Sequence, residues 1–219
     1  MFLLNKIYYL IKVMSLINVI TFTFHYFLFL TKISKSIDPL IKKYKLTLTE
    51  KTKSAYKYLD LNKWIFENLL RVYKLNLHKQ KSKKILDLGC GPGFFIYICN
   101  YFGHEVLGLD LKDHFYSELT NALGINVINK EISANKTLQL DSKEKFDLVT
   151  AFMICFDRDN SHNLWDTEKW RFFLNDIEKN ILNDYGRIIL AFNRDSNLER
   201  RQEVINLIRS NPTQILLTT

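Results

Sequence analysis

Residues 85–95 read ILDLGCGPGFF, the clearest structural signal in this chain. The stretch begins as an apolar run typical of a buried strand and continues into a loop with glycine at every second position. Glycine has no Cβ atom, so it adopts positive φ angles readily and lets a ligand lie against bare backbone. The stretch therefore predicts a strand, a ligand-binding loop and the start of a helix.

The same stretch resembles the first motif of class I S-adenosylmethionine (SAM) dependent methyltransferases. That motif reads apolar, apolar, acidic, apolar, Gly, x, Gly, x, Gly, and every position matches here. The resemblance implies that Asp87 orients the loop and the amino end of the methionine part of the cofactor. It also implies that Gly89, Gly91 and Gly93 let the cofactor approach the main chain. SAM is therefore the cofactor that we expect.

A dinucleotide-binding loop is the main alternative, and it requires the register G-x-G-x-x-G. Three residues after Gly91 stands Phe94, and three residues after Gly93 stands Ile96. The register therefore favours SAM over a nicotinamide cofactor.

Asp110 provides a second anchor, at the end of the next predicted strand and 17 residues after Gly93. A carboxylate at this place can accept hydrogen bonds from both ribose hydroxyls. For adenine, the resemblance points to Glu131 and Ile132, with Asn129 and Asp141 as open competitors. The full predicted cofactor site consists of Asp87, Gly89, Cys90, Gly91, Gly93, Asp110, Leu111, Glu131, Ile132 and Phe152.

Short apolar runs alternate with helical patterns from residue 85 onward, which indicates βαβ units and a parallel sheet. Strands are expected at 85–88, 105–110, 125–128, 146–152, 187–192 and 214–219. Helices are expected at 60–76, 94–102, 114–123, 165–182 and 196–209, and a turn at 183–186. The predicted fold class is α/β, a doubly wound, mostly parallel sheet of the Rossmann-like methyltransferase type with an N-terminal helical extension. The family usually ends with an antiparallel strand, and we expect the sheet to lack it or the sequence to be truncated.

The charge of the chain is unevenly distributed. Residues 1–84 carry 17 Lys and Arg against 4 Asp and Glu, whereas residues 85–219 carry 14 against 19. A basic arm on an acidic domain points to an anionic surface such as lipid headgroups or RNA, although solvated lysines would give the same count. We divide the chain into an N-terminal extension at 1–59 and a methyltransferase domain at 60–219, because the length suits one domain plus an extension.

Residues 13–31 form a run of 19 residues without Lys, Arg, Asp or Glu. A membrane-spanning helix needs about 20 apolar residues, so the run is near the minimum length. A membrane anchor, a helix packed on the enzyme, and a start site misplaced upstream of Met14 all remain open. The heavier lysine count after the run would keep the domain cytoplasmic if the run inserted. We predict a cytoplasmic protein, with membrane association through residues 1–45 left open.

Three cysteines, Cys90, Cys99 and Cys155, show neither a CxxC pair nor the spacing of a zinc site. An odd and sparse set argues for a reducing compartment. No metal site is predicted.

Residues 151–158 span the end of the fourth predicted strand and the loop after it, and in this family that segment forms part of the floor beside the transferable methyl group. It contains no Asn/Asp-Pro-Pro-Tyr/Phe motif, and Cys155 is not in a Pro-Cys context, so the DNA-modifying subclasses are not supported. A protonated acceptor needs a base, and Asp157, Asp159 and His162 are the candidates on this loop. We expect Trp170 in the core and Trp165 to be freer to contact a substrate.

The predicted function is methyl transfer from SAM to a small-molecule or lipid-like acceptor. RNA methylation and a catalytically silent SAM-binding module remain alternatives, so a nucleic-acid partner stays open. The sequence does not predict an oligomeric state.

Overall fold

The computed structural model describes residues 15–46, 57–140, 144–158, 163–193, 202–211 and 213–216. Its centre is one six-stranded sheet in which every strand pairing is parallel. The strands are β1 (Lys84–Leu88), β2 (Glu105–Asp110), β3 (Val127–Asn129), β4 (Phe146–Ile154), β5 (Leu182–Phe192) and β6 (Gln214–Leu216). Their spatial order is β3-β2-β1-β4-β5-β6, so the direction of winding reverses between β1 and β4. The predicted fold class is confirmed.

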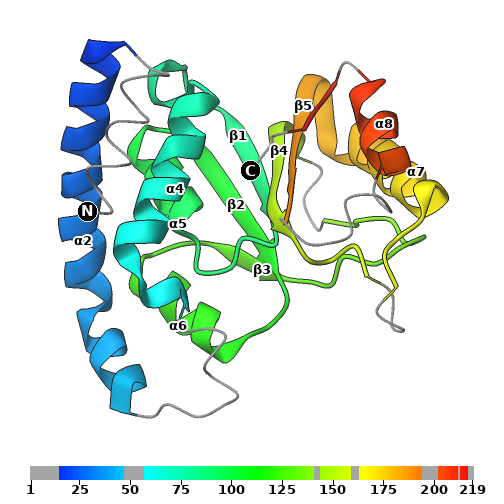
Figure 1. Ribbon diagram of the computed structural model, residues 1–219. Helices are drawn as coiled ribbons and strands as arrows, with labels where there is room; N and C mark the ends of the chain where they lie inside the picture. The colour runs from blue at the N-terminus through cyan, green and yellow to red at the C-terminus, as the bar shows by residue number, and fades with distance from the viewer. Residues whose placement is uncertain are drawn as a thin grey trace.

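Helices cover both faces of the sheet (Figure 1). On one face lie α4 (Leu61–Lys74), α5 (Phe94–Tyr101) and α6 (His114–Ala122). On the other lie α7 (Thr167–Asp176), its π-helical continuation η3 (Ile177–Ile181) and α8 (Gln202–Arg209). Two short 3₁₀ turns, η1 (Lys57–Leu59) and η2 (Leu77–Lys79), flank α4. The helix α2 (Leu16–Leu46) adds a further layer outside α4, α5 and α6.

The central strand β1 is buried on both sides because helices cover both faces. Successive side chains of a strand point to opposite faces. Ile85 accordingly belongs to the core beneath α4 and α5, whereas Leu86 and Leu88 belong to the core beneath α7. Asp87 shares the face of Ile85, and this places its carboxyl group on the side covered by α4.

Some predicted boundaries are wrong, and local contacts explain them. The third strand begins at Val127 and not at residue 125, because the Ile125 amide bonds the carbonyl of Thr120 and closes the end of α6. The predicted turn at 183–186 lies within β5 as a bulge opposite one residue of β4. Pairing passes from Phe146 and Leu182 directly to Leu148 and Arg187.

The helix predicted at 165–182 begins at Thr167, after the N-cap residue Asp166, whose carboxylate accepts the Lys169 amide at 2.9 Å. Its last turn, Ile177–Ile181, is π-helical. The last described strand, β6, pairs in parallel with β5. The predicted residues 196–201 and 217–219 lie outside the described part of the chain.

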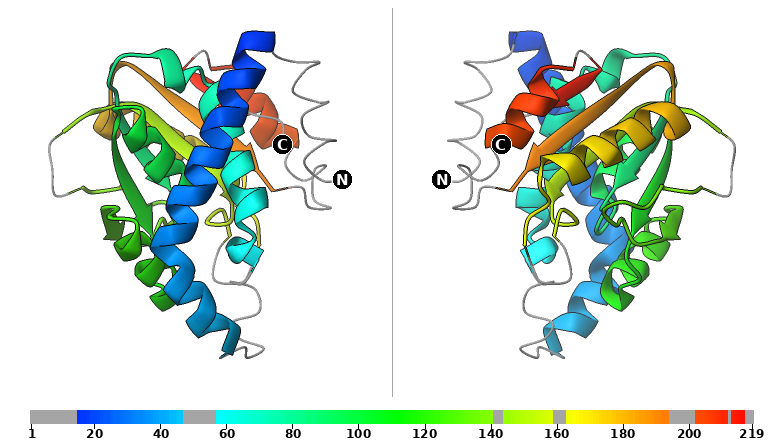
Figure 2. Two further views of the ribbon diagram at one scale, coloured as in Figure 1. Left: turned by 90° about the vertical axis from the view of Figure 1, so that its left-hand side faces the viewer. Right: turned by 90° about the vertical axis from the view of Figure 1, so that its right-hand side faces the viewer.

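The long helix α2 packs lengthwise on the domain, as the side view in Figure 2 shows. Its inner face is mainly apolar and is buried, with a spacing of three or four residues that marks one side of a helix. This inner face consists of Val19, Phe22, Tyr26, Phe29, Ile33 and Ile37. Polar contacts add to the packing: the Tyr26 hydroxyl donates to Asn62 at 2.9 Å, and His25 Nδ1 lies 2.8 Å from the Tyr73 hydroxyl.

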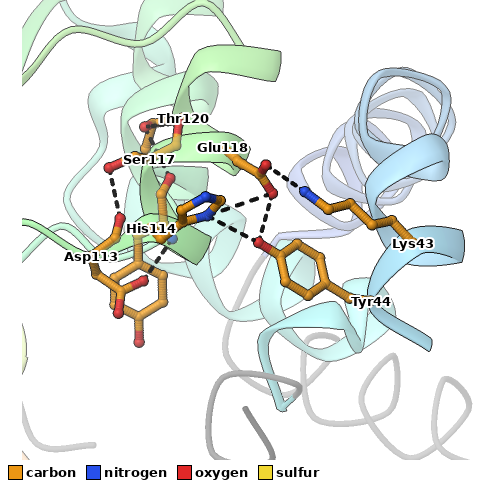
Figure 3. Close-up of polar contacts among 8 residues, drawn as sticks. Lys43, Tyr44, Asp113, His114, Ser117, Glu118 and Thr120 are labelled. Carbon is orange, nitrogen blue, oxygen red and sulfur yellow. Dashed lines mark hydrogen bonds and ion pairs between the residues drawn. The ribbon is translucent and has the colours of Figure 1, made fainter. Parts of the chain in front are cut away.

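The C-terminal end of α2 is fixed to α6 through one carboxylate (Figure 3). Glu118 accepts from Lys43 Nζ at 2.6 Å and from the Tyr44 hydroxyl at 2.6 Å. The ring of His114 lies in the same group, 3.9 Å from the second carboxylate oxygen. Because α2 is held at this end and along its inner face, it forms one body with the sheet and its helices.

Candidate functional site

A cavity of about 340 Å³ opens at the carboxyl ends of β1, β2 and β4, where the winding of the sheet reverses. In open α/β sheets this switch point is the usual place for a ligand. The volume falls within the range of small-molecule sites, about 300–1,000 Å³. The cavity therefore lies where both the topology and the glycine motif place a ligand.

The glycine loop shapes one wall of this cavity through its backbone. Gly89, Gly91 and Gly93 all have positive φ, at 67°, 53° and 77°. A Cβ atom on Gly93 would lie 2.7 Å from Ile125 Cδ1, whereas a Cβ on Gly91 would meet nothing within 4 Å. Glycine at position 93 is thus needed for packing at the start of α5. At position 91 the absence of a side chain leaves the backbone accessible to a ligand in the cavity.

Asp110 ties the end of β2 to the glycine loop. Its Oδ2 accepts the Gly91 amide at 2.5 Å, and its Oδ1 accepts the Leu111 amide at 2.8 Å. Burial raises the pKa of this carboxyl above its usual value, and the two amide hydrogen bonds oppose the rise. A carboxylate has about four acceptor positions, so two remain for the hydroxyls of a ribose.

Asp87 is a buried carboxyl at the end of β1. Its Oδ1 accepts the hydroxyl of Thr150, its neighbour on β4, at 2.6 Å. Burial raises the pKa of Asp87 to about 7, against opposing effects of the Thr150 hydrogen bond and of Arg71. A cationic ligand group placed beside it would favour the ionised form.

Arg71 is a site residue that the sequence analysis missed. It lies on α4, lines the cavity and donates from its guanidinium to Asn68 Oδ1 at 2.7 Å. The guanidinium also sits 4.4 Å from the ring centre of Phe152. Burial lowers its pKa, and the negative field of Asp87 acts in the opposite direction. No local motif marks Arg71, because α4 precedes the glycine loop and meets it only through folding.

The lining fits SAM by the chemistry of its groups. The methionine part of SAM carries a carboxylate, an ammonium and a sulfonium, so it needs one cation and at least one anion. If SAM binds here, Arg71 would be the cation available to its carboxylate, and Asp87 would be the anion available to its ammonium. Asp110 retains acceptor positions for the ribose. The described residues hold no cluster of His, Cys, Asp or Glu that could bind a metal ion.

The end of β4 contains a second feature that the sequence analysis did not reveal. Met153 lines the cavity with φ of 55°, at a point where the pairing with β5 shifts register. Residues other than glycine rarely adopt this backbone conformation, and such strained positions often occur at functional sites. The Asn193 amide group holds the turn by donating to the carbonyls of Met153 and Ile154 at 3.2 and 3.1 Å.

Most of the predicted cofactor residues lie together at the cavity. The predicted residues that line it are Asp87, Gly89, Cys90, Gly91, Asp110, Leu111, Glu131, Ile132 and Phe152. Gly93 does not line it and is instead the N-cap residue of α5. The roles of these residues remain predictions.

The structure places the predicted acceptor-side residues less favourably. Asp157 is buried and is not among the residues that line the cavity. Asp159 and His162 lie outside the described residues. Trp165 was expected to be free, but it is buried 5.6 Å from the ring of Trp170 and 5.7 Å from Phe173. The reason is that its backbone bonds Asp157, which turns the ring into the core beneath α7.

Comparison with solved structures found 231 similar chains, and the three described below are at most 20% identical to this protein. The glycopeptide N-methyltransferase MtfA is 17% identical with a TM-score of 0.41, and the match covers 57% of this chain and 52% of MtfA. The PH0226 protein of Pyrococcus horikoshii is 20% identical with a TM-score of 0.47, covering 74% and 72%. DesVI of Streptomyces venezuelae is 16% identical with a TM-score of 0.48, covering 65% and 57%. The chain thus spans about half the length of MtfA.

No curated protein sequence matches the chain at a significant level. A family profile does match it: the description is FtsJ-like methyltransferase, and the match covers residues 51–171. This range includes α4, the glycine loop, Asp110 and the whole of β4, which together form most of the cavity wall. The chain therefore belongs to the FtsJ-like methyltransferase family, a family of class I SAM-dependent methyltransferases.

Proposed function

We propose that this protein transfers a methyl group from SAM to a small-molecule or lipid-like acceptor bound in the cavity at the end of β4. One observation carries the proposal: Arg71, Asp87 and Asp110 converge from three separate elements on a single cavity beside the glycine loop. Their charges complement the carboxylate, ammonium and ribose of SAM. When bound, SAM supplies a methyl group that is already activated as a sulfonium substituent.

The protein residues then have the tasks of holding the cofactor and aligning an acceptor. The Arg71 guanidinium is held by a hydrogen bond to Asn68 and lies over the ring of Phe152. Asp110 fixes the glycine loop by bonding the Gly91 amide. Both groups are in place in this structure, so little order has to be created when the cofactor binds.

The cavity rim supports an acceptor with apolar or planar character. Tyr58, Trp64 and Tyr116 form an aromatic group there, with ring centres 4.8 Å apart for Tyr58 and Trp64 and 5.5 Å apart for Tyr58 and Tyr116. Phe95 and Phe152 also line the cavity, and their rings pack edge to face at 4.9 Å. Aromatic walls of this kind typically surround small organic ligands.

The acceptor class can be tested by incubating the purified protein with radiolabelled SAM and fractionated cell extract. We expect label in the small-molecule or lipid fraction. Label in RNA would favour the alternative that the basic N-terminal segment suggests, and binding of SAM without any transfer would identify a silent SAM-binding module. The full-length protein with Gly91→Val is the control, because a β-branched side chain at positive φ is strained and would project into the cavity.

We also propose a cytoplasmic location, on the basis of the sparse unpaired cysteines. In the described part of the chain Cys90, Cys99 and Cys155 are all free thiols. Fractionation of cells that produce a tagged protein tests this proposal.

A further inference from the structure

The outer face of α2 is a convex apolar surface that no described part of the chain covers. It consists of Leu16, Ile17, Ile20, Phe24 and Phe27, whose exposed fractions lie between 49% and 74%. The half-exposed ring of Tyr101 on α5 lies at the inner side of the helix, where it contacts the rings of His25 and Phe29. Clustered apolar side chains of this size usually mark a binding surface.

The second half of α2 has a basic exposed side. Residues 32–45 contain five Lys and one Asp. Lys32 and Lys35 follow directly after the apolar part of the helix, and Lys32 Nζ lies 4.9 Å from the ring centre of Tyr101. An apolar face beside lysines complements a surface that is itself apolar inside and anionic at its boundary.

The hydroxyl groups on this part of α2 need no water. Thr21 donates to the carbonyl of Ile17 at 3.0 Å, Thr23 to that of Val19 at 2.8 Å, and Thr31 to that of Phe27 at 2.9 Å. A polar group that enters an apolar medium without a partner is strongly unfavourable. Because these hydroxyls are satisfied within the helix, the outer face can leave water without an unpaired donor.

We propose that the outer face of α2 binds the surface of an anionic phospholipid bilayer, with the helix lying in the interface and its lysines at the headgroups. This inference is independent of the methyl acceptor. The stretch Leu16–Tyr44 is long and apolar enough to cross a membrane by length and composition. A spanning arrangement would require α2 to leave the domain, which would expose its inner face and break the Tyr26 and His25 contacts. Interfacial binding keeps both faces of the helix in an apolar environment.

Vesicle sedimentation with the full-length protein tests the proposal. The protein should pellet with vesicles of phosphatidylcholine and phosphatidylserine, less in high salt, and weakly with phosphatidylcholine alone. The double variant Ile20→Gln/Phe24→Gln should weaken binding by roughly tenfold or more. Its matched control, Phe172→Gln/Tyr185→Gln, removes exposed aromatic side chains from the opposite side of the molecule and should leave binding unchanged.

Two charge-reversal variants separate the contribution of the lysines from that of the apolar side chains. Lys32→Glu/Lys35→Glu should abolish the preference for phosphatidylserine, whereas Lys136→Glu/Lys179→Glu, on other surfaces, should not. All four variants should bind SAM like the wild type, so a failure of membrane binding is distinguishable from a failure of the proposed methyl transfer.

Three outcomes would overturn the proposal. The first is equal pelleting of the wild type and Ile20→Gln/Phe24→Gln. The second is a wild-type dimer in light scattering that this variant converts to a monomer, with no vesicle binding by either, which would assign the face to a second copy of the chain. The third concerns the depth of the helix in the bilayer, measured by the tryptophan fluorescence that Phe24→Trp adds to that of the wild type. The proposal predicts stronger quenching by lipids brominated near the headgroup. Stronger quenching by lipids brominated at the bilayer centre would indicate a spanning helix and overturn it.

Discussion

In the first half of α2 the inner and outer faces have similar apolar composition but opposite surroundings. Phe22 and Phe29 on the inner face are buried among rings of α4 and α5, at centroid distances of 5.0–5.2 Å. Phe24 and Phe27 on the outer face contact solvent over about half of their surface or more. The comparison teaches that an apolar run in a sequence does not reveal its partner, because an intramolecular core and an external surface select the same residue types.

The largest expected effect concerns this contrast directly. Phe29→Ala should lower the free energy of unfolding by about 3–5 kcal/mol, because it removes a fully buried ring from a closely packed cluster. Phe24→Ala should change it by no more than about 0.5 kcal/mol. Urea unfolding of both variants measures the difference. Similar values for the two variants would contradict the described position of α2.

Arg71 provides the next test, and it contrasts a buried charge with the exposed lysines of α2. Arg71→Met should weaken SAM binding by about 1.5–3 kcal/mol, which is roughly 10- to 150-fold, through loss of a charge-assisted hydrogen bond. Lys35→Met should leave it unchanged. Isothermal titration calorimetry gives both dissociation constants. Equal binding by Arg71→Met and the wild type would remove this residue from the cofactor site.

A second buried charge of the site, Asp87, should make cofactor binding depend on pH. The expected change in affinity is smaller than that for Arg71→Met. Asp87 has a pKa of about 7 in the fold because of burial, and the ammonium of SAM favours its ionised form. SAM affinity should therefore rise several-fold as the pH increases through 7 and level off above it. Asp87→Asn should flatten that rise, as titrations over a pH series will show.

The raised pKa of Asp87 also makes the stability of the fold depend on pH. The folded protein binds a proton at Asp87 more tightly than the unfolded chain, so the protonated form stabilises the fold at low pH. This contribution is lost as the pH rises from the ordinary aspartate pKa of 3.8 through about 7. Asp87→Asn should consequently raise the melting temperature most at alkaline pH, which thermal unfolding at two pH values measures.

The smallest expected effect concerns the polar end of α2. Glu118→Gln should destabilise the protein by roughly 0.5 kcal/mol, because the Lys43 ion pair is partly exposed and screened by solvent. The Tyr44 hydroxyl can still donate to the amide oxygen of the new side chain. A loss several times larger in urea unfolding would mean that this end, and not the apolar inner face, holds α2 in place.

Much of the fold was predictable because its signals are local. The alternation of apolar runs with helical patterns gave the order of strands and helices, and β2 was predicted with its observed bounds. The glycine loop was predictable because three positive φ angles leave a direct record in the sequence. The strand at 127–129 was misplaced because Ile125 is apolar for a different reason, namely its packing at the end of α6 against the position of Gly93.

The candidate site was predictable only where its residues adjoin the glycine loop or a strand end. Arg71 could not be found, because a lysine-rich segment offers many cations and nothing local selects one. Met153 could not be found, because its positive φ arises from a register shift between two strands that are distant in sequence. Trp165 was misjudged because its position near a helix start does not indicate whether the preceding loop turns the ring inward.

The amino-acid sequence alone determines the kind of sheet, the glycine loop and the acids Asp87 and Asp110, because backbone conformation and strand ends depend on neighbouring residues. Folding in three dimensions adds what depends on distant residues. The pleat of β1 turns Asp87 toward α4. The packing of α4 on the sheet places Arg71 at the same cavity. The packing of α2 divides one apolar run into a buried face and an exposed one, since a helix on a single domain can bury only one side.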